Sequence, residues 1–402
     1  MILQTILLSR KSQQWRFHNY FLLFLNCSME QQIYKGKLTQ FHRLKIAKKE
    51  KLTKNTFSLE LEIPEDLKEN FQFEAGQYVS IQFQSHGKNV INDYSMTSAP
   101  YEEKIVLGIK INSVQSATSQ LFENYEVGDE ILVSEPGGRF TLVSKPSEFR
   151  TIVGFAAGIG ITPILSHFKN ILHTEPRTRL FLFLGNKSSE ELVYRELLDN
   201  LASKHHNRLQ IFYFYSQEKT ADQFFYGRLD AKKLNLIINQ ILHLDDTDEE
   251  STIWDAVDEV LICGKGEMIK TLANACYHHG IPKKNIHFEL FEEFNDDIYP
   301  VEKEFPLIED VQVDFKLLGK NYQTELPDNL EKILQQLLIQ KFPVPYSCKS
   351  GICGSCECTL EEGEVELLEN EYLTEKEEAQ GKILACMSIA KSKKIKLNFD
   401  FN

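Results

Sequence analysis

The 402-residue sequence lacks an apolar run long enough to cross a bilayer. Its two N-terminal runs, Ile2–Leu8 and Phe21–Leu25, fall far short of the roughly 20 residues that a spanning helix needs. Positive charge is also in deficit, because 45 Lys and Arg stand against 58 Asp and Glu, which gives a formal net charge of −13. Such a balance argues against nonspecific binding to nucleic acid. We therefore predict that neither a membrane nor a nucleic acid is a partner.

Acidic residues are absent from the first 28 positions, which carry Arg10, Lys11 and Arg16. A basic, acid-free stretch is compatible with an organellar presequence, whereas a secretory signal is disfavoured because the apolar run is short and Asn26 precedes no small-residue cleavage site. A third interpretation, which we favour, is that Met29 is the true start. We therefore treat residues 1–35 as an extraneous or targeting segment and expect a cytoplasmic protein.

The eight cysteines are too unevenly spread for a disulfide framework, because five of them lie in the last 55 residues. Clustering of this kind in a long chain indicates metal ligation in a reducing compartment. Cys348, Cys353 and Cys356 are spaced C-x4-C-x2-C, and Cys386 follows after 29 intervening residues. This is the spacing of a plant-type [2Fe–2S] site, in which four thiolates converge on two irons. A structural zinc site is disfavoured because a second close pair is missing.

Small residues accompany these four predicted ligands. Glycines and serines in the loop allow backbone N–H groups to approach the cluster sulfurs: Ser347, Ser350, Gly351, Gly354 and Ser355. Cys358 falls outside the spacing, and we predict a buried residue there rather than a ligand. Residues 344–400 resemble a plant-type ferredoxin along their whole length, from PYSCKSGICGSC to the closing KLNFD. The resemblance implies a β-grasp domain that carries the cluster near its surface.

The chain divides into three predicted domains. Residues 36–148 show short alternating segments separated by Gly, Pro, Asp and Asn, which favours an antiparallel β-barrel. From 149 to 293, strands alternate with helices, including predicted helices over 162–172, 190–201 and 267–278, and this pattern is typical of a parallel α/β sheet. We interpret the charged stretch 294–310 as a linker and residues 311–402 as the α+β ferredoxin-like domain. The fold class is thus a multidomain barrel, α/β and β-grasp arrangement.

A glycine-rich turn follows the first strand of the α/β region. Gly158 and Gly160 would let the backbone approach a pyrophosphate, and the helix that begins near Thr162 offers free N–H groups. Pro163 suits the first turn of that helix. A Gly-x-Gly turn alone is weak evidence, but Gly185 and Gly264 also end strands at the same predicted edge of the sheet.

These pieces occur in the order found in the ferredoxin–NADP reductase superfamily, which residues 38–295 resemble throughout. The similar motifs are Asp93-Tyr94-Ser95, Glu135-Pro136-Gly137-Gly138-Arg139-Phe140, Gly158-Ile159-Gly160-Ile161-Thr162-Pro163, Gly185-Asn186, Gly227-Arg228, Cys263-Gly264 and Glu289-Leu290-Phe291. The resemblance implies that Tyr94 stacks on a flavin, that Ser95 lies near its N5, that Thr162 lies near flavin and nicotinamide, and that Cys263 lies beside the nicotinamide.

The resemblance also assigns the predicted site as a whole. The catalytic candidates are Tyr94, Ser95, Cys263 and Glu289. The predicted cofactor contacts are Asn92, Tyr94, Ser95, Ile109, Lys110, Thr118, Gly138, Gly158, Gly160, Thr162, Lys187, Ser188, Gly264 and Phe291. Three positions depart from the family pattern: Asn92 replaces an Arg that contacts flavin phosphates, Gln115 replaces a Gly, and Lys265 replaces a Pro.

Three units in this order imply one electron path. A nicotinamide gives up two electrons as hydride, a [2Fe–2S] cluster accepts one, and a flavin connects the two. The chain looks most like the reductase subunits of phenylacetyl-CoA oxygenases, which implies FAD, NADPH (or NADH), and a di-iron oxygenase partner. Lys187 and Ser188, with no carboxylate before Glu190, favour NADPH. The alternatives are a reductase of another oxygenase or hydroxylase, and a non-catalytic iron–sulfur carrier whose flavin site has decayed.

Overall fold

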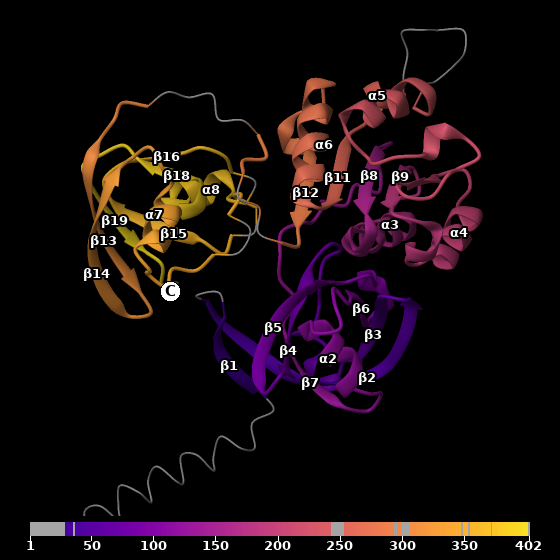
Figure 1. The fold of residues 1–402 in the computed structure, drawn as a ribbon, viewed down its shortest axis with the longest axis horizontal. Helices are drawn as coiled ribbons and strands as arrows, with labels where there is room; N and C mark the ends of the chain where they lie inside the picture. Colours follow the sequence, from indigo (N-terminus) through magenta and orange to yellow (C-terminus); the bar gives the residue numbers. More distant parts are fainter. Residues whose placement is uncertain are drawn as a thin grey trace, which may run out of the picture.

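The computed structural model describes residues 29–34, 37–242, 253–292, 294, 296–299, 305–346, 349–352, 354–370 and 372–400. Three lobes follow one another along the chain, as Figure 1 shows: a barrel in indigo and purple, an α/β domain from magenta to orange, and a C-terminal domain in orange and yellow. The predicted multidomain fold class is thereby confirmed. Within these ranges, no helix is both long enough and apolar enough to span a membrane.

The barrel domain is an antiparallel seven-stranded sheet with the order β5-β4-β7-β2-β3-β6, and β1 pairs with β2. Its inward-facing residues alternate along the strands and form one apolar core that includes Leu59, Leu61 and Leu107. Its elements are β1 (Met29–Tyr34), β2 (Lys37–Thr53), β3 (Thr56–Glu62), β4 (Tyr78–Ser85), β5 (Lys88–Ser95), β6 (Ile105–Lys110), α2 (Ala117–Asn124) and β7 (Glu130–Ser134).

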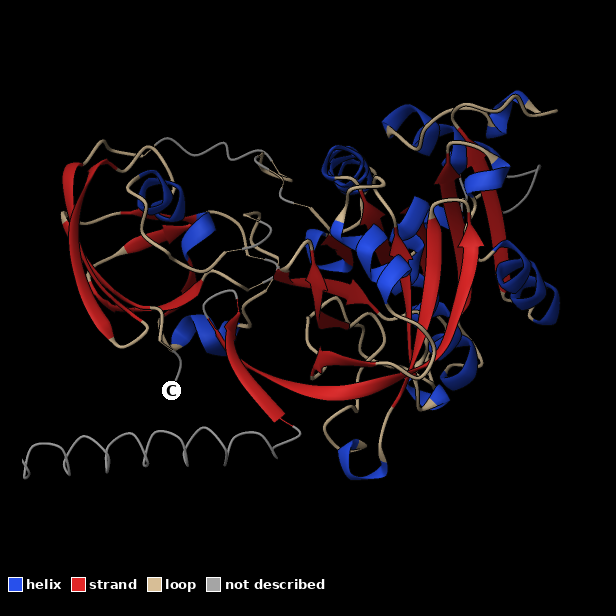
Figure 2. Cartoon of the chain, turned by 60° about the horizontal axis from the view of Figure 1, so that its bottom comes forward, coloured by secondary structure: helices blue, strands red, loops and turns tan. Residues whose placement is uncertain are grey.

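The α/β domain is a five-stranded parallel sheet with the order β10-β9-β8-β11-β12. Neighbouring residues of β8 enter different cores, Val153 on one face and Ile152 on the other, so helices must cover both faces (Figure 2). The elements are β8 (Thr151–Ala157), α3 (Ile161–Thr174), β9 (Arg179–Asn186), α4 (Arg195–Lys204), β10 (Leu209–Tyr215), α5 (Ala231–Gln240), β11 (Glu259–Gly264), α6 (Gly266–His278) and β12 (Ile286–Leu290).

The C-terminal domain contains a five-stranded mixed sheet with the order β14-β13-β19-β15-β17, beside the pair β16 and β18. One core of buried apolar residues, including Phe315, Leu334 and Leu397, lies between the sheet and α7. The elements are β13 (Glu309–Leu317), β14 (Lys320–Asp328), α7 (Ile333–Ile339), β15 (Glu357–Glu362), β16 (Val365–Leu367), α8 (Glu375–Ala379), β17 (Lys382–Leu384), β18 (Ser388–Ala390) and β19 (Lys394–Asn398).

Helix α3 joins the barrel to the α/β domain. Ser166 Oγ donates to the carbonyl of Ser98 at 2.6 Å, and the buried His167 ring hydrogen bonds to the carbonyl of Phe140 at 2.8 Å. Burial lowers the pKa of His167 to about 4, so the ring is neutral at physiological pH. A side chain at Gly76 would collide with this contact, because its Cβ would lie 1.9 Å from the Phe140 carbonyl oxygen. These buried contacts fix the relative position of the two domains.

Three predicted boundaries are wrong. The barrel extends further toward the N-terminus than residue 36, because Met29–Tyr34 pairs with β2; residues 1–28 lie outside the described ranges. The stretch 294–310 is not only a linker: Ile298 and Tyr299 are buried in the α/β core, and β13 already begins at Glu309. The helix expected over 190–201 begins only at Arg195, after Tyr194 adopts a positive φ of 60°.

Candidate active site

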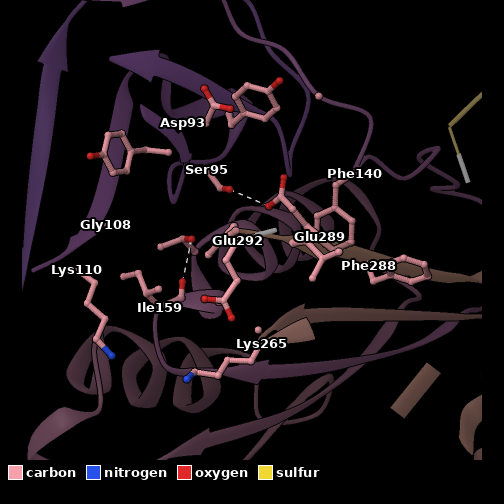
Figure 3. Close-up of a pocket in the computed structure, with 18 of the residues that line it drawn as sticks. Asp93, Ser95, Gly108, Lys110, Phe140, Ile159, Lys265, Phe288, Glu289 and Glu292 are labelled. Carbon is pink, nitrogen blue, oxygen red and sulfur yellow. Dashed lines mark hydrogen bonds between the residues drawn. The ribbon is translucent and has the colours of Figure 1, made fainter. Parts of the chain in front are cut away.

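A cavity of about 780 Å³ lies where the barrel and the α/β domain meet, which is the size of a small-molecule site. The ends of β5, β6, β8, β11 and β12 contribute to its wall, with the loop after β7 and two residues of the C-terminal domain. Twelve predicted site residues line it: Asn92, Tyr94, Ser95, Lys110, Thr118, Gly138, Gly158, Gly160, Thr162, Gly264, Glu289 and Phe291. Figure 3 shows part of this lining.

Ser95 and Glu289 meet across the domain boundary (Figure 3). Ser95 Oγ at the end of β5 donates to Glu289 Oε2 on β12 at 2.8 Å. The half-buried Glu289 lines the cavity, and desolvation of its carboxyl group, with the nearby charge of Asp93, raises the pKa of Glu289 to about 8. The carboxyl group is therefore largely protonated at pH 7 and holds a proton at the mouth of the hydride-transfer site that the sequence predicts.

Tyr94 directly precedes Ser95 in the sequence and also lines the cavity. Asn92 Nδ2 donates to Tyr94 Oη at 3.2 Å, and burial raises the pKa of this phenol to about 12, so it remains neutral. Asn92 thus orients the ring that the sequence assigns to flavin stacking. The residue that departs from the family pattern is part of the site, although it carries no charge.

The glycine-rich turn is open on the side that faces the cavity. Gly158 has a φ of +54°, and a Cβ built there would meet no atom within 4 Å. A Cβ on Gly160, by contrast, would lie 2.3 Å from the carbonyl oxygen of Cys263. Thr162 Oγ1 donates to the carbonyl of Ile159 at 3.0 Å and closes the turn at the start of α3. The turn therefore fits a phosphate that approaches its exposed backbone N–H groups.

Part of the cavity wall carries groups suited to the flavin phosphates. Lys110, Asn112 and Thr118 line it, and they offer a positive charge, an amide and a hydroxyl. Gln115 contributes its backbone carbonyl to a contact with His86 at 3.3 Å instead. The residues present thus fit a flavin nucleotide despite the substitution of Arg by Asn92.

Four predicted contacts lie away from the cavity wall. Ile109 is fully buried in the barrel core. Cys263 is fully buried beneath Gly160, where burial and the neighbouring Glu289 raise its thiol pKa well above the usual value. Lys187 and Ser188 follow β9 outside the described cavity lining, and the 57% exposed Lys187 side chain has its Nζ 3.9 Å from Glu191 Oε1.

Several lining residues were missed by the sequence reasoning. They are Tyr78, Asp93, Gly108, Asn112, Arg139, Phe140, Ala157, Ile159, Lys265, His287, Phe288, Leu290, Glu292, Tyr346 and Ile352. Some stand inside motifs already quoted, so the motifs pointed to the region without assigning each side chain. Tyr346 and Ile352 belong to the C-terminal domain, and only a three-dimensional arrangement brings them to this cavity.

The predicted cluster site lies only partly within the described residues. Cys348 and Cys353 fall outside them, whereas Cys356 and Cys386 are buried side by side, with the Cys386 backbone N–H donating to Cys356 Sγ at 3.5 Å. Gly351 and Gly354 adopt φ values of +76° and +65°, which favour glycine. Two converging thiols and an N–H···S contact fit a cluster ligated by sulfur.

Comparisons with known proteins give three family matches along the chain. Residues 43–142 match the family described as "Oxidoreductase FAD-binding domain", residues 155–274 the "Oxidoreductase NAD-binding domain" and residues 315–391 the "2Fe-2S iron-sulfur cluster binding domain". The chain is 28% identical over 364 residues to a 1,2-phenylacetyl-CoA epoxidase subunit from Escherichia coli K12, and the match covers 90% of this chain and 99% of that protein.

Two further similarities span most of the chain. The ferredoxin reductase component of 3-ketosteroid-9-alpha-monooxygenase from Rhodococcus rhodochrous is 26% identical over 86% of this chain and 93% of that protein. The structure of an intact type IV self-sufficient cytochrome P450 monooxygenase has a TM-score of 0.58 and 19% identity, over 88% of this chain and 40% of that chain. The latter likeness concerns the fold.

The site chemistry and the domain matches lead to one class of protein. When bound, a flavin accepts a hydride from a nicotinamide and returns its electrons singly, which a [2Fe–2S] cluster requires. This chain's own residues supply a neutral hydroxyl–carboxyl pair beside the cavity, an open phosphate turn and converging thiols. The chain therefore combines an FAD-binding domain, an NAD-binding domain and a C-terminal [2Fe–2S] domain, which is the composition of an NAD(P)H-dependent oxidoreductase, and it is similar to reductase components of oxygenase systems.

Proposed function

We propose that this chain is the reductase of a phenylacetyl-CoA-type di-iron oxygenase and that it uses NADPH as its electron source. The observation that carries the proposal is the similarity to the 1,2-phenylacetyl-CoA epoxidase subunit from Escherichia coli, which spans nearly the whole of both chains. The ferredoxin reductase component of a steroid monooxygenase also matches most of this chain, so a reductase for another oxygenase is the second candidate. In either case the oxygenase, not this chain, binds the organic substrate.

Reconstitution with purified oxygenase components tests this proposal. We expect NADPH oxidation by the chain to be coupled to loss of phenylacetyl-CoA when the oxygenase component of phenylacetyl-CoA epoxidase is present. The 3-ketosteroid-9-alpha-monooxygenase oxygenase, with its own substrate, is the comparison. Coupled turnover with the steroid oxygenase and none with the epoxidase would replace the first candidate by the second.

Within the site, we propose a division of roles. Tyr94 stacks on the flavin, and Ser95 and Glu289 hold a proton beside the atom that receives hydride. Cys263, beneath Gly160, sets the depth of the nicotinamide pocket. Their positions support these roles: Ser95 and Glu289 are hydrogen bonded at the cavity, and Cys263 packs under the turn that faces it. A bound flavin and a bound [2Fe–2S] cluster would let the two electrons that NADPH gives up as hydride leave the chain one at a time.

Replacing Glu289 by glutamine is expected to change the pH dependence of the flavin half-reaction. In the unmodified chain, kcat/KM for NADPH with ferricyanide should fall as the pH rises through about 8, because the carboxyl then becomes an anion that opposes the arrival of two electrons. Glu289→Gln should remove this fall in kcat/KM above pH 8. It should also reduce the rate at pH 7 by about tenfold or more, because the glutamine amide cannot release a proton. Steady-state rates from pH 6 to 9 measure both effects.

Asp93→Asn provides a matched control, because the Asp93 charge helps to raise the pKa of Glu289. The fall in kcat/KM should move to lower pH in this variant and remain visible. The stability of the chain should also depend on pH. Between pH 4.5, the usual pKa of a glutamate, and about pH 8, the folded chain keeps a proton on Glu289 that the unfolded chain has lost. The free energy of unfolding should therefore fall with rising pH across this window, and less so in Glu289→Gln. An unchanged fall in kcat/KM in Glu289→Gln would assign it to another group.

Nucleotide choice rests on the segment after β9. We expect Lys187→Ala to narrow the preference for NADPH over NADH, which should be about 10- to 100-fold if one charge-assisted phosphate contact operates. Glu218 lies nearby and accepts hydrogen bonds from Ser189 N and Oγ at 2.6 and 2.9 Å. A carboxylate here repels a 2′-phosphate, so Glu218→Gln should widen the preference.

Measurement of kcat/KM for both nucleotides in each variant tests this pair of opposite effects. Lys232→Ala, an exposed lysine on α5, is the control and should change neither value. Equal values for NADPH and NADH in the unmodified chain, or the same ratio in Lys187→Ala, would remove Lys187 from the nucleotide site.

A further inference from the structure

One side chain of the flavin cavity crosses to the C-terminal domain. Arg139, in the loop after β7, lines the cavity and makes a two-point contact with Glu377 on α8: Nη1 to Oε2 is 2.8 Å and Nη2 to Oε1 is 2.6 Å. Arg139 Nη1 also donates to the carbonyl of Tyr372 at 2.7 Å. Parallel donors of this kind fix both distance and angle between two groups. The contact therefore restrains the orientation of the C-terminal domain as well as its proximity.

The second partner of Arg139 leads to the cluster loop. The guanidinium carbon lies 4.0 Å from the centroid of the Tyr372 ring, which is cation–π geometry. The Tyr372 ring also packs against Gly354, where an added Cβ would lie only 1.9 Å from Tyr372 Cζ. Gly354 follows the predicted ligand Cys353 directly in the sequence. A continuous chain of contacts thus joins the cavity, Arg139, the Tyr372 ring and the loop that carries the cluster ligands.

The acceptor of this contact is held in place by its own helix. Glu377 is the N3 residue of a capping box on α8: it accepts from Thr374 N at 2.9 Å and from Thr374 Oγ1 at 2.8 Å. Hydrogen bonds from Arg139 and Thr374 hold the pKa of Glu377 well below its usual range, so the pair stays charged at neutral pH. A glutamine can replace glutamate in a capping box, which allows the charge to be removed while α8 keeps its cap.

The other contacts of the C-terminal domain are made with the α/β domain. Ile352 lines the cavity and packs against the α/β core, and Lys283 on the α/β domain pairs with Glu369 at 3.2 Å. Lys332 also pairs with Asp297. These contacts hold the C-terminal domain to the α/β domain. Among the ion pairs of the described residues, that of Arg139 and Glu377 joins the cavity wall itself to the cluster-bearing domain.

We propose that Arg139 is a positioning residue for electron transfer out of the flavin cavity, and that its contact with Glu377 and Tyr372 docks the cluster loop against the cavity. A bound cluster would accept one electron in each docked state and pass it to the electron acceptor before the next transfer, so two such cycles would remove the pair that NAD(P)H delivers as hydride. The pair is also partly exposed, at 38% for Arg139 and 20% for Glu377, so salt weakens it. Docking is therefore strong enough to orient the domain and weak enough to release it for a partner.

Removal of the Glu377 charge tests the proposal in the full-length, cofactor-loaded chain. Glu377→Gln should slow cluster reduction, followed by stopped-flow absorbance after NADPH is added, by about three- to tenfold. Flavin reduction and ferricyanide turnover should stay unchanged, because Glu377 does not line the cavity. Raising the salt concentration should slow cluster reduction in the unmodified chain and have little effect in Glu377→Gln. The matched control is Glu361→Gln, which removes a carboxylate paired with Lys396 inside the same domain.

A structural readout accompanies the kinetics. Small-angle X-ray scattering of the oxidised protein should show a larger radius of gyration for Glu377→Lys, where two positive charges oppose one another, than for the unmodified chain or Glu361→Gln. Iron and flavin content verify that each variant is loaded. Where Glu377→Lys loses iron, Glu377→Gln alone decides, since its helix cap is retained. Cluster reduction at the unmodified rate and with the unmodified salt dependence in Glu377→Gln would overturn the proposal.

Discussion

Cys386→Ser is expected to leave the chain without its [2Fe–2S] cluster. The cluster needs four thiolates, and Cys386 is a buried residue whose backbone N–H already contacts Cys356 Sγ. Iron and acid-labile sulfide per chain should fall by about tenfold or more. Reduction of cytochrome c should be lost with them, whereas NADPH–ferricyanide turnover should persist, because the flavin cavity is formed mainly by the other two domains. The same result is expected for Cys348→Ser, Cys353→Ser and Cys356→Ser.

The neighbouring Cys358 provides the control. It is buried in the core of the C-terminal domain, with its thiol among apolar side chains. Cys358→Ser should keep iron and sulfide, at a modest cost in stability from the buried hydroxyl. Iron and sulfide that survive all four ligand substitutions would show that the cluster is bound elsewhere. Loss of iron and sulfide in Cys358→Ser alone would show that Cys358 is a ligand.

Separation of the C-terminal domain is expected to uncouple the two halves of the reaction. A chain that ends after residue 300 should bind FAD and reduce ferricyanide with NADPH, while its cytochrome c reduction falls by about two orders of magnitude or more, because the one-electron carrier is missing. The end point follows from the structure: Ile298 and Tyr299 are buried in the α/β core, so they must be retained. Absorbance of bound flavin and the two acceptor assays measure the effect.

A second truncation, ending at residue 293, tests the boundary itself. It removes Ile298 and Tyr299 from the core and uncovers the start of α6, where Phe294 lies against Gly266. We expect a lower melting temperature than for the chain ending at residue 300, because large buried side chains are lost from the core. A folded, FAD-reconstituted chain ending after residue 300 that lacks ferricyanide turnover would contradict the assignment of hydride transfer to the first two domains.

The features of the fold that depend on short stretches of consecutive residues could be predicted from the sequence. Strand alternation, the glycine-rich turn and the C-x4-C-x2-C spacing each occupy a few consecutive residues, and the three-domain fold that they predict is confirmed. The start of α4 was misplaced because the positive φ of Tyr194 interrupts a sequence whose apolar spacing continues through it. The anchor at Ile298 and Tyr299 was missed because these two residues stand among charged and proline residues that are typical of a linker.

The candidate site was less accessible to sequence reasoning for a different physical reason. Ser95 and Glu289 are 194 residues apart, and their hydrogen bond exists only because α3 fixes the barrel on the α/β domain. Resemblance placed both residues in the site, but their coupling and the raised pKa of Glu289 depend on three-dimensional burial. Arg139 was quoted within a motif, yet its partners Tyr372 and Glu377 lie more than 230 positions away. No local pattern marks such a pair.

The anchoring of Tyr299 sets the length of the segment that would tether the C-terminal domain if its contacts with the cavity were released. Tyr299 is held in the α/β core, and the buried Asn329 holds Pro306 and Ile308 to the C-terminal domain, so at most six residues, 300–305, lie between two fixed points. A fully extended chain covers at most about 3.6 Å per residue, which limits this connecting segment to about 25 Å. A released domain therefore stays within about one domain diameter of its docking site, at a local concentration in the millimolar range. Release would therefore free the cluster for an electron acceptor while keeping the cluster close to the flavin cavity.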